Sequence, residues 1–149
     1  MLPFFILVAA TLILRAIGAA GVTPLTSWII CLRGGLAAMF LLTASAHWGK
    51  RRPDLIRMVP AGFPRADLIV TITGVLEILG AAGLLIPATA SAAAACLAVM
   101  LAAMFAANVR AAREHLTIGG KAVTALPLRT ILQVIFIGAL VMAGFHKYI

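Results

Sequence analysis

Charged side chains are scarce in this sequence. Only 11% of its 149 residues are charged and only four are acidic, whereas 64% are hydrophobic and the mean hydropathy is +1.15. A soluble domain carries about 25% charged residues, so that class is excluded. Several apolar runs reach the roughly 18 residues that a membrane-spanning helix needs, and no alternating barrel pattern competes with them. The sequence therefore predicts an all-α, polytopic membrane helical bundle that forms a single domain.

The residue patterns of several kinds of catalytic site are also missing. The two cysteines, Cys31 and Cys96, form no Cys-x-x-Cys pair for dithiol chemistry. Three scattered histidines without suitable cysteine or carboxylate spacing make no recognisable zinc site. A phosphate loop, a dinucleotide-binding glycine fingerprint and a nucleophile elbow are absent as well. The sequence thus predicts no metal site and identifies no catalytic residue, and it leaves open whether the protein is an enzyme.

The basic residues mark the ends of the apolar runs. The net charge is +8, and nine of the twelve Lys and Arg residues fall in residues 50–65 and 110–129, with two predicted helices between these stretches. Both stretches would then lie on one side of the bilayer, which the positive-inside rule identifies as cytoplasmic. This arrangement argues against nucleic acid as a partner. We expect a protein of the cytoplasmic (inner) membrane, with its amino terminus inside and its carboxyl terminus outside.

Five helices are predicted, at about residues 2–20, 27–48, 67–86, 89–113 and 127–145. The first could be a signal peptide, but no basic region precedes its apolar part. We therefore expect an N-terminal helix added to four core transmembrane helices.

Two short elements are expected in the basic loops. Pro53 and Pro60 bound about two helical turns, which form either an interfacial helix or a solvated loop. Gly119 and Gly120 lie between two short β-compatible runs and indicate a β-hairpin.

A single carboxylate, Glu77, lies in the apolar run of residues 70–86. At about 1.5 Å per residue it would lie near the bilayer midplane. An ionisable group at that depth is costly, so we expect it to face other helices and to serve function. Depths estimated from the helix rise place Arg33 on one side of Glu77, and Gln133 and then Arg129 on the other. The predicted ligand-binding site is this ladder, with two further residues at its cytoplasmic mouth: Arg33, Glu77, Gln133 and Arg129, then Asn108 and His47.

Two readings of this ladder remain open. Two arginines against one carboxylate leave a positive charge for an anionic or strongly hydrogen-bonding ligand, such as a quinone carbonyl. Alternatively, the buried ion pair serves only to fix the register of the helices. His47 is either a proton carrier, because its ordinary pKa is near neutral, or an interfacial residue at a helix end.

Five motifs in order resemble the DoxX-like family of small integral membrane proteins. The resemblance runs from about Arg33 to the last helix, through these segments: residues 33–40 with 45–48, residues 58–64, residues 73–80, residues 105–108 and residues 128–133. It implies a small bundle, usually of four spans. Members are associated with thiosulfate:quinone oxidoreductase subunits, with a membrane oxidoreductase complex linked to thiol stress and, in a distant branch, with receptor assembly.

The resulting functional expectation is an accessory subunit of a membrane redox system that binds a quinone-like or other small amphipathic ligand. Quinone is the one cofactor suggested. The alternative is a non-enzymatic assembly factor or chaperone that contacts partner membrane proteins, or a second copy of this chain, through a ridge of small residues: Ala94, Ala98, Ala102 and Ala106. A proton-coupled transporter is disfavoured because the sequence shows no internal repeat.

Overall fold

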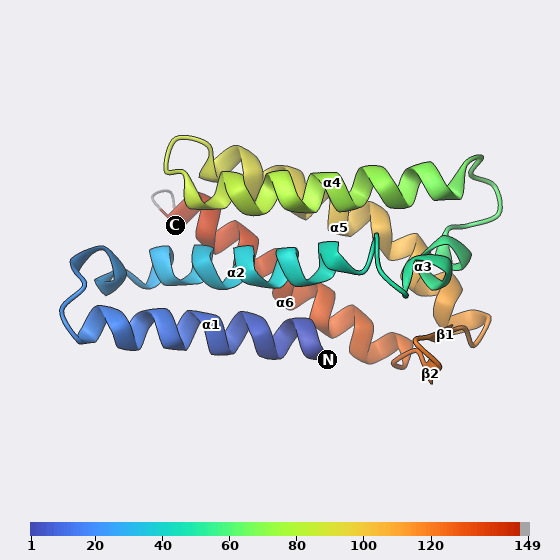
Figure 1. Ribbon diagram of the computed structural model, residues 1–149, viewed down its shortest axis with the longest axis horizontal. Helices are drawn as coiled ribbons and strands as arrows, with labels where there is room; N and C mark the ends of the chain where they lie inside the picture. Colours follow the sequence, from blue (N-terminus) through green and yellow to red (C-terminus); the bar gives the residue numbers. More distant parts are fainter. Residues whose placement is uncertain (147–149) are drawn as a thin grey trace.

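The computed structural model describes residues 1–146, which fold mostly as helices (Figure 1). Five helices of this part are long and apolar enough to cross a membrane. The elements in chain order are α1 (Leu2–Ala19), a 3-10 turn (Thr23–Thr26), α2 (Trp28–Ser45), α3 (Arg52–Met58), α4 (Ala66–Leu85), α5 (Ala90–Arg113), β1 (Thr117–Ile118), β2 (Lys121–Ala122) and α6 (Leu126–Phe145). The predicted mainly helical architecture is confirmed, including the extra helix at the amino terminus.

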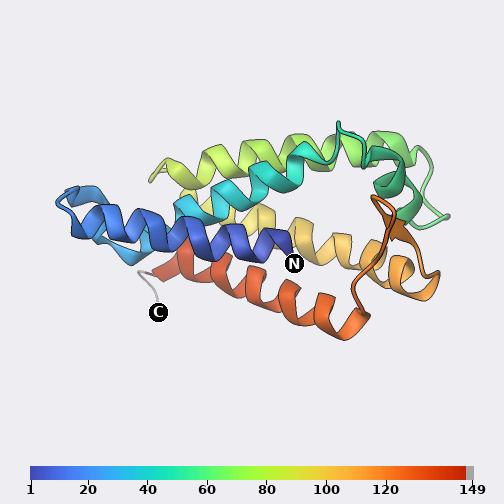
Figure 2. The same cartoon turned by 60° about the horizontal axis from the view of Figure 1, so that its bottom comes forward.

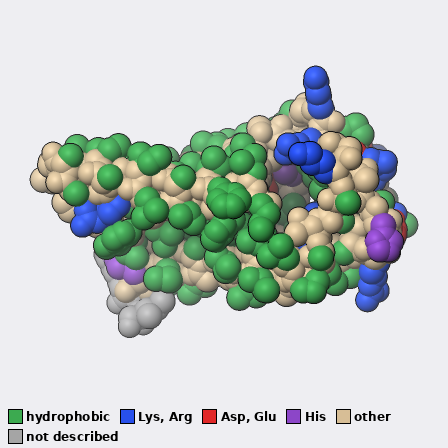
Figure 3. All heavy atoms as spheres, turned by 90° about the horizontal axis from the view of Figure 1, so that it is seen from below, with side chains coloured by type: hydrophobic (Ala, Val, Ile, Leu, Met, Phe, Trp, Pro, Cys, Tyr) green, Lys and Arg blue, Asp and Glu red, His purple; other side chains and the backbone are tan. Residues whose placement is uncertain are grey.

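The core lies between α2, α4, α5 and α6, and α1 runs along the outside of α2 (Figures 1 and 2). The fully buried side chains of this core come from all four of these helices and include Leu36, Phe40, Leu84, Leu97 and Leu140. Hydrophobic side chains also cover the long sides of the molecule, whereas most Lys and Arg side chains gather near one end (Figure 3). This distribution is what a bundle surrounded by hydrocarbon needs.

Glycines allow the helices to approach closely. A Cβ atom on Gly35 of α2 would lie 2.0 Å from Thr11 Oγ1 of α1, and one on Gly144 of α6 would lie 2.7 Å from the Cβ of Ala94 in α5. Such contacts are typical of helices that pack in a membrane, where small residues bring backbones together.

The helix α2 ends at Ser45, before the predicted end at residue 48. His47 and Trp48, just past this end, lie against Gly74 near the middle of α4. The chain turns away here, and the carbonyl oxygen of His47 accepts a hydrogen bond from Arg52, at the start of α3. Beyond this level α4 and α5 continue without α2 beside them, and α3 and the hairpin occupy that end of the bundle (Figure 1).

Both short elements predicted in the basic loops are present. The segment between the two prolines forms the helix α3, so the solvated-loop alternative is wrong. In the hairpin, Thr117 pairs with Ala122 and Ile118 with Lys121. Gly119 and Gly120 have φ angles of 59° and 75°, the left-handed values that a two-residue hairpin turn requires and that glycine adopts without strain.

Candidate ligand-binding site

Glu77 points into the bundle and meets the end of α2. The residue is 3% exposed, and its Oε2 accepts a hydrogen bond of 2.8 Å from the Thr43 hydroxyl. His47 Nδ1 lies 3.8 Å from the same oxygen, which is too long for a hydrogen bond. We call Thr43, His47 and Glu77 the glutamate cluster. The expectation that Glu77 faces other helices is confirmed.

The predicted pairing of Arg33 with Glu77 is wrong. Arg33 Nε donates a hydrogen bond of 2.9 Å to the carbonyl oxygen of Ala143, in the last turn of α6. Ser91 Oγ donates one of 2.7 Å to the next carbonyl, that of Gly144. The last carbonyls of a helix lack donors within it and form its negative end, so Arg33 caps α6. Thr43 is ten residues further along α2, about 15 Å away.

The remaining predicted residues form a second group between α5 and α6. Gln133 Nε2 donates to the carbonyl oxygen of Leu101 at 2.8 Å. Asn108 Nδ2 donates to Gln133 Oε1 at 3.1 Å, and Arg129 Nη1 donates to Asn108 Oδ1. We call Asn108, Arg129 and Gln133 the arginine cluster. Within the described residues no hydrogen bond or ion pair joins it to Glu77, so the predicted ladder is divided into two separate clusters.

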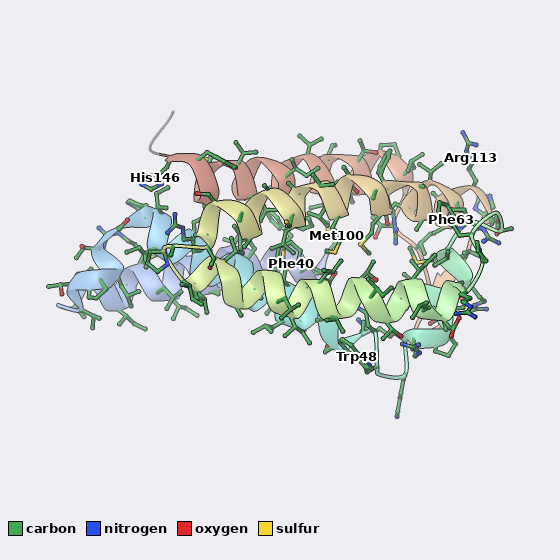
Figure 4. The ribbon with its side chains drawn as sticks, turned by 90° about the horizontal axis from the view of Figure 1, so that it is seen from above. Phe40, Trp48, Phe63, Met100, Arg113 and His146 are labelled. Atoms are coloured by element: carbon green, nitrogen blue, oxygen red, sulfur yellow. The ribbon has the colours of Figure 1, made fainter. Side chains whose placement is uncertain are left out.

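The glutamate cluster borders an apolar cavity of about 230 Å³ between α3, α4 and α5. His47 is the one ionisable side chain in its lining. In the side-chain view Met100 lies near the middle of the bundle and Phe63 near the end (Figure 4). The apolar lining includes Leu55, Met58, Val59, Pro60, Phe63, Ile69, Val70, Met100 and Met104. Methionine side chains are flexible and adapt to ligands of different shape.

The hydrogen bonding of His47 fixes which ring nitrogen is available to a ligand. Nδ1 lies 3.1 Å from the carbonyl oxygen of Thr43. A carbonyl only accepts, so Nδ1 carries the proton and donates, which leaves Nε2 of the neutral ring as an acceptor. Burial lowers the pKa of His47 below its ordinary value of 6.5, and the positive charge of Arg52 lowers it further. His47 Nε2 makes no hydrogen bond to any of the described residues.

Arg52 joins the glutamate cluster to the start of α3. Its Nη1 donates to the carbonyl oxygen of His47 at 2.8 Å, and its Nη2 donates to Thr71 Oγ1 of α4 at 2.9 Å. One guanidinium therefore positions the His47 backbone, α3 and α4 relative to one another, as the forked donor geometry of arginine allows.

The helix α3 is also held from the hairpin and from α5. Asp54 accepts a hydrogen bond of 2.7 Å from the backbone N–H of Gly119 and another from Arg57. These two donors hold the pKa of Asp54 below its ordinary value. Arg110 of α5 donates to the carbonyl oxygen of Val59. These links keep α3 across the end of the cavity.

Sequence reasoning missed Thr43 and the methionines of the cavity. Thr43 precedes His47 by four residues, and residues at this spacing lie on the same face of a helix. The spacing could therefore have predicted that Thr43 lies beside His47. The methionines carry no comparable signal, because their pattern is the same in a packed core. Among the described residues no group of three or more His, Cys, Asp and Glu side chains is placed to hold a metal ion.

The predicted alanine ridge lies partly inside the bundle. Ala94 is buried and packs near Gly144, whereas Ala102 and Ala106 are exposed. Half of the ridge therefore serves packing between α5 and α6.

A family model described as a domain of unknown function, DUF8561, matches residues 36–143. The matched range contains both clusters and α3, and it leaves Arg33 and α1 outside. Neither the curated proteins nor the solved structures give a match. The DoxX-like resemblance stays a prediction.

Proposed function

For this chain, which belongs to the DUF8561 family of unknown function, we propose the role of a membrane protein that binds a small amphipathic ligand beside His47. The ligand that fits best carries a hydroxyl group on an apolar ring, as a quinol does. The proposal extends to the setting expected from the sequence: an accessory subunit of a redox system in the cytoplasmic membrane, with both basic loops on the cytoplasmic side.

One observation carries this proposal: the side chains that line the cavity are apolar except for the imidazole of His47 and the hydroxyl of Thr73. Few polar groups in an apolar cavity are typical of small-molecule sites, where they orient the ligand. Because His47 Nδ1 is occupied by the Thr43 carbonyl, Nε2 favours a ligand that donates a hydrogen bond. A quinol hydroxyl donates, whereas a quinone carbonyl only accepts. The site therefore favours the reduced form, in contrast to the quinone carbonyl expected from the sequence.

Glu77 supports this arrangement through α2. Its carboxyl group is bonded to Thr43, the residue whose carbonyl holds His47. Glu77 does not line the cavity itself, so its role is to position the end of α2. Arg33 has no part in the proposed ligand site, because it caps α6 at another place in the bundle.

The test is ligand binding by the purified full-length protein in neutral detergent. A short-chain benzoquinol, kept reduced, and the matching benzoquinone are added separately, and the midpoint of thermal unfolding is measured. We expect the quinol to raise the midpoint more than the quinone, because a ligand that binds the folded state stabilises it. His47→Phe should remove the effect. His146→Phe, at an exposed position in the last turn after α6, is the matched control and should retain it.

Two results would contradict the proposal. Neither compound changes the midpoint of the wild-type protein, or His47→Phe responds as the wild-type protein does. If only the quinone stabilises the protein, the assigned tautomer is wrong.

The second candidate function, an assembly factor, is favoured by the exposure of Ala102 and Ala106 on α5. Ala102→Leu tests it, because a larger side chain at an exposed contact prevents close helix approach. Loss of a co-purifying membrane partner with an unchanged quinol response would support assembly.

A further inference from the structure

We propose that the arginine cluster is a second, separate binding site, which holds the carboxylate or phosphate group of an anionic ligand beside the start of α1. The cluster borders a cavity of about 210 Å³. The cavity lining comes from the start of α1, from α5, from the segment after the hairpin and from α6: Met1, Pro3, Phe4, Leu101, Asn108, Thr124, Arg129, Leu132, Gln133 and Phe136.

The hydrogen bonds of the cluster all run in one direction. Gln133 donates to the Leu101 carbonyl, Asn108 donates to Gln133, and Arg129 donates to Asn108. The side-chain oxygens of Gln133 and Asn108 therefore already accept hydrogen bonds, from Asn108 and Arg129 respectively. The last member of the series is Arg129, whose guanidinium still has N–H groups that make no hydrogen bond within the cluster. The cluster therefore offers donors and a positive charge to the cavity, which is the chemistry that binds an anion.

The charge of Arg129 is not neutralised within the described residues. The ion pairs found there join Arg57 to Asp54 and Arg110 to Glu114. Arg129 Nε is buried and has no hydrogen-bond partner among residues 1–146. A partly buried cation without a counter-charge is costly, and an anion in the adjacent cavity would remove that cost.

The walls of the cavity indicate an amphiphile. Arg129 is the fourth residue of α6, so it lies near the end of the bundle where most basic side chains gather and where the headgroups of anionic lipids are found. Leu132 and Phe136 follow on the same helix toward the middle, and Phe4 faces them from α1. An acyl chain would lie along these apolar side chains. A small soluble anion would use only the polar end.

This site is distinct from the proposed quinol site. The two cavities meet neighbouring parts of the α5 surface: Met100 and Met104 line the His47 cavity, whereas Leu101 and Asn108 line this one. The two sets of residues share no lining residue. Loss of one site is therefore measurable without loss of the other.

The test uses the full-length protein in neutral detergent with two probes, oleate and inorganic phosphate, and follows the unfolding midpoint as each is titrated. Oleate has a carboxylate and an acyl chain, whereas phosphate has the charge alone. We expect oleate to stabilise the wild-type protein, and Arg129→Gln to weaken the apparent oleate affinity about tenfold or more, as expected for a lost hydrogen bond to a charged group. Arg113→Gln, at an exposed position at the end of α5, is the matched control and should bind as the wild-type protein does.

A second variant separates the two sources of the anion and guards against misfolding of Arg129→Gln. Leu132→Trp fills the acyl part of the cavity and leaves Arg129 in place. A lipid-type ligand predicts that this variant loses the oleate response. A response to phosphate that Leu132→Trp keeps would also support the site and would identify a soluble anion as its ligand. Equal oleate affinity in the wild-type, Arg129→Gln and Leu132→Trp proteins, or stabilisation by neither probe, would overturn the proposal.

Discussion

The Thr43 hydroxyl donates a hydrogen bond of 2.8 Å to Glu77 Oε2 and so links the last turn of α2 to the carboxyl group in the middle of α4. Thr43→Val keeps the shape of the side chain but leaves a buried carboxyl oxygen without this partner. We expect a loss of about 1–3 kcal/mol in the free energy of unfolding. Thr43→Ser keeps the hydroxyl and should lose less. Chemical unfolding in detergent measures both, and equal stability of the wild-type and Thr43→Val proteins would contradict the assigned bond.

Gly74 sets the distance between α4 and the end of α2. A Cβ atom there would lie 2.7 Å from the Cβ of His47 and 2.8 Å from the Cη2 of Trp48. We expect Gly74→Ala to destabilise the protein by about 1–3 kcal/mol through overpacking and to weaken quinol binding, because His47 must move. Gly138 of α6 has nothing within 4 Å of such an atom, so Gly138→Ala is the matched control. It should be neutral or slightly stabilising, since alanine favours helix.

Arg33 distinguishes a capping role from a role in ligand binding. We expect Arg33→Met to lower the free energy of unfolding by about 1–2 kcal/mol, because the carbonyl oxygen of Ala143 loses a charged donor. The affinity for the benzoquinol should stay unchanged. Arg113→Met, at the exposed position, should alter neither quantity. A large loss of quinol affinity in Arg33→Met would contradict the separation of Arg33 from the ligand site.

The burial of His47 predicts a dependence of stability on pH. Its pKa is lowered from 6.5 in the folded state, so the unfolded state binds more protons as the pH falls through this value. The contribution of His47 to stability should therefore be constant above about pH 7 and should decrease below about pH 6.5. The charged or ionisable groups that face His47 are Glu77 and Arg52. Unfolding is measured between pH 5.5 and 8, and the change in stability on acidification should be less favourable in the wild-type and His146→Gln proteins than in His47→Gln.

Asp54 holds the hairpin against α3. We expect Asp54→Ala to speed hydrogen exchange at the Gly119 amide, because that N–H loses its acceptor. In the wild-type protein, acid should lower the protection of this amide, measured relative to its intrinsic exchange rate at each pH. The pKa of Asp54 is lowered from 3.8, so the contact persists through neutral pH and is lost as the pH falls well below that value. Asp67→Ala, in the first turn of α4, is the control. Unchanged exchange at Gly119 in Asp54→Ala would contradict the contact.

The elements of the fold were predictable because their signals are local. Long apolar runs define the five long helices, and two consecutive glycines define the hairpin turn. The end of α2 was placed three residues late, because the hydrogen bond from Arg52 to the His47 carbonyl joins residues of different elements. No periodicity within residues 27–48 contains that information.

The site was predictable only where neighbours on one helix contribute to it. Arg129 and Gln133 are four residues apart, and their contacts with Asn108 agree with the expected grouping. Arg33 was misplaced because the depth estimate assumed that all helices begin and end in two common planes. In the structure α2 ends beside the middle of α4, so side chains of equal estimated depth do not meet. The offset between helices depends on packing between distant segments.

The contacts of α3 with the hairpin and with α5 make the two basic loops a single unit. Lys50 precedes α3 and Lys121 lies in β2, and both are exposed. Because Asp54 is bonded to Gly119 and Arg110 to Val59, no arrangement of the chain in the bilayer separates these two lysines between compartments. We expect an amine reagent that does not cross membranes to modify both of them from one side of intact vesicles and neither from the other.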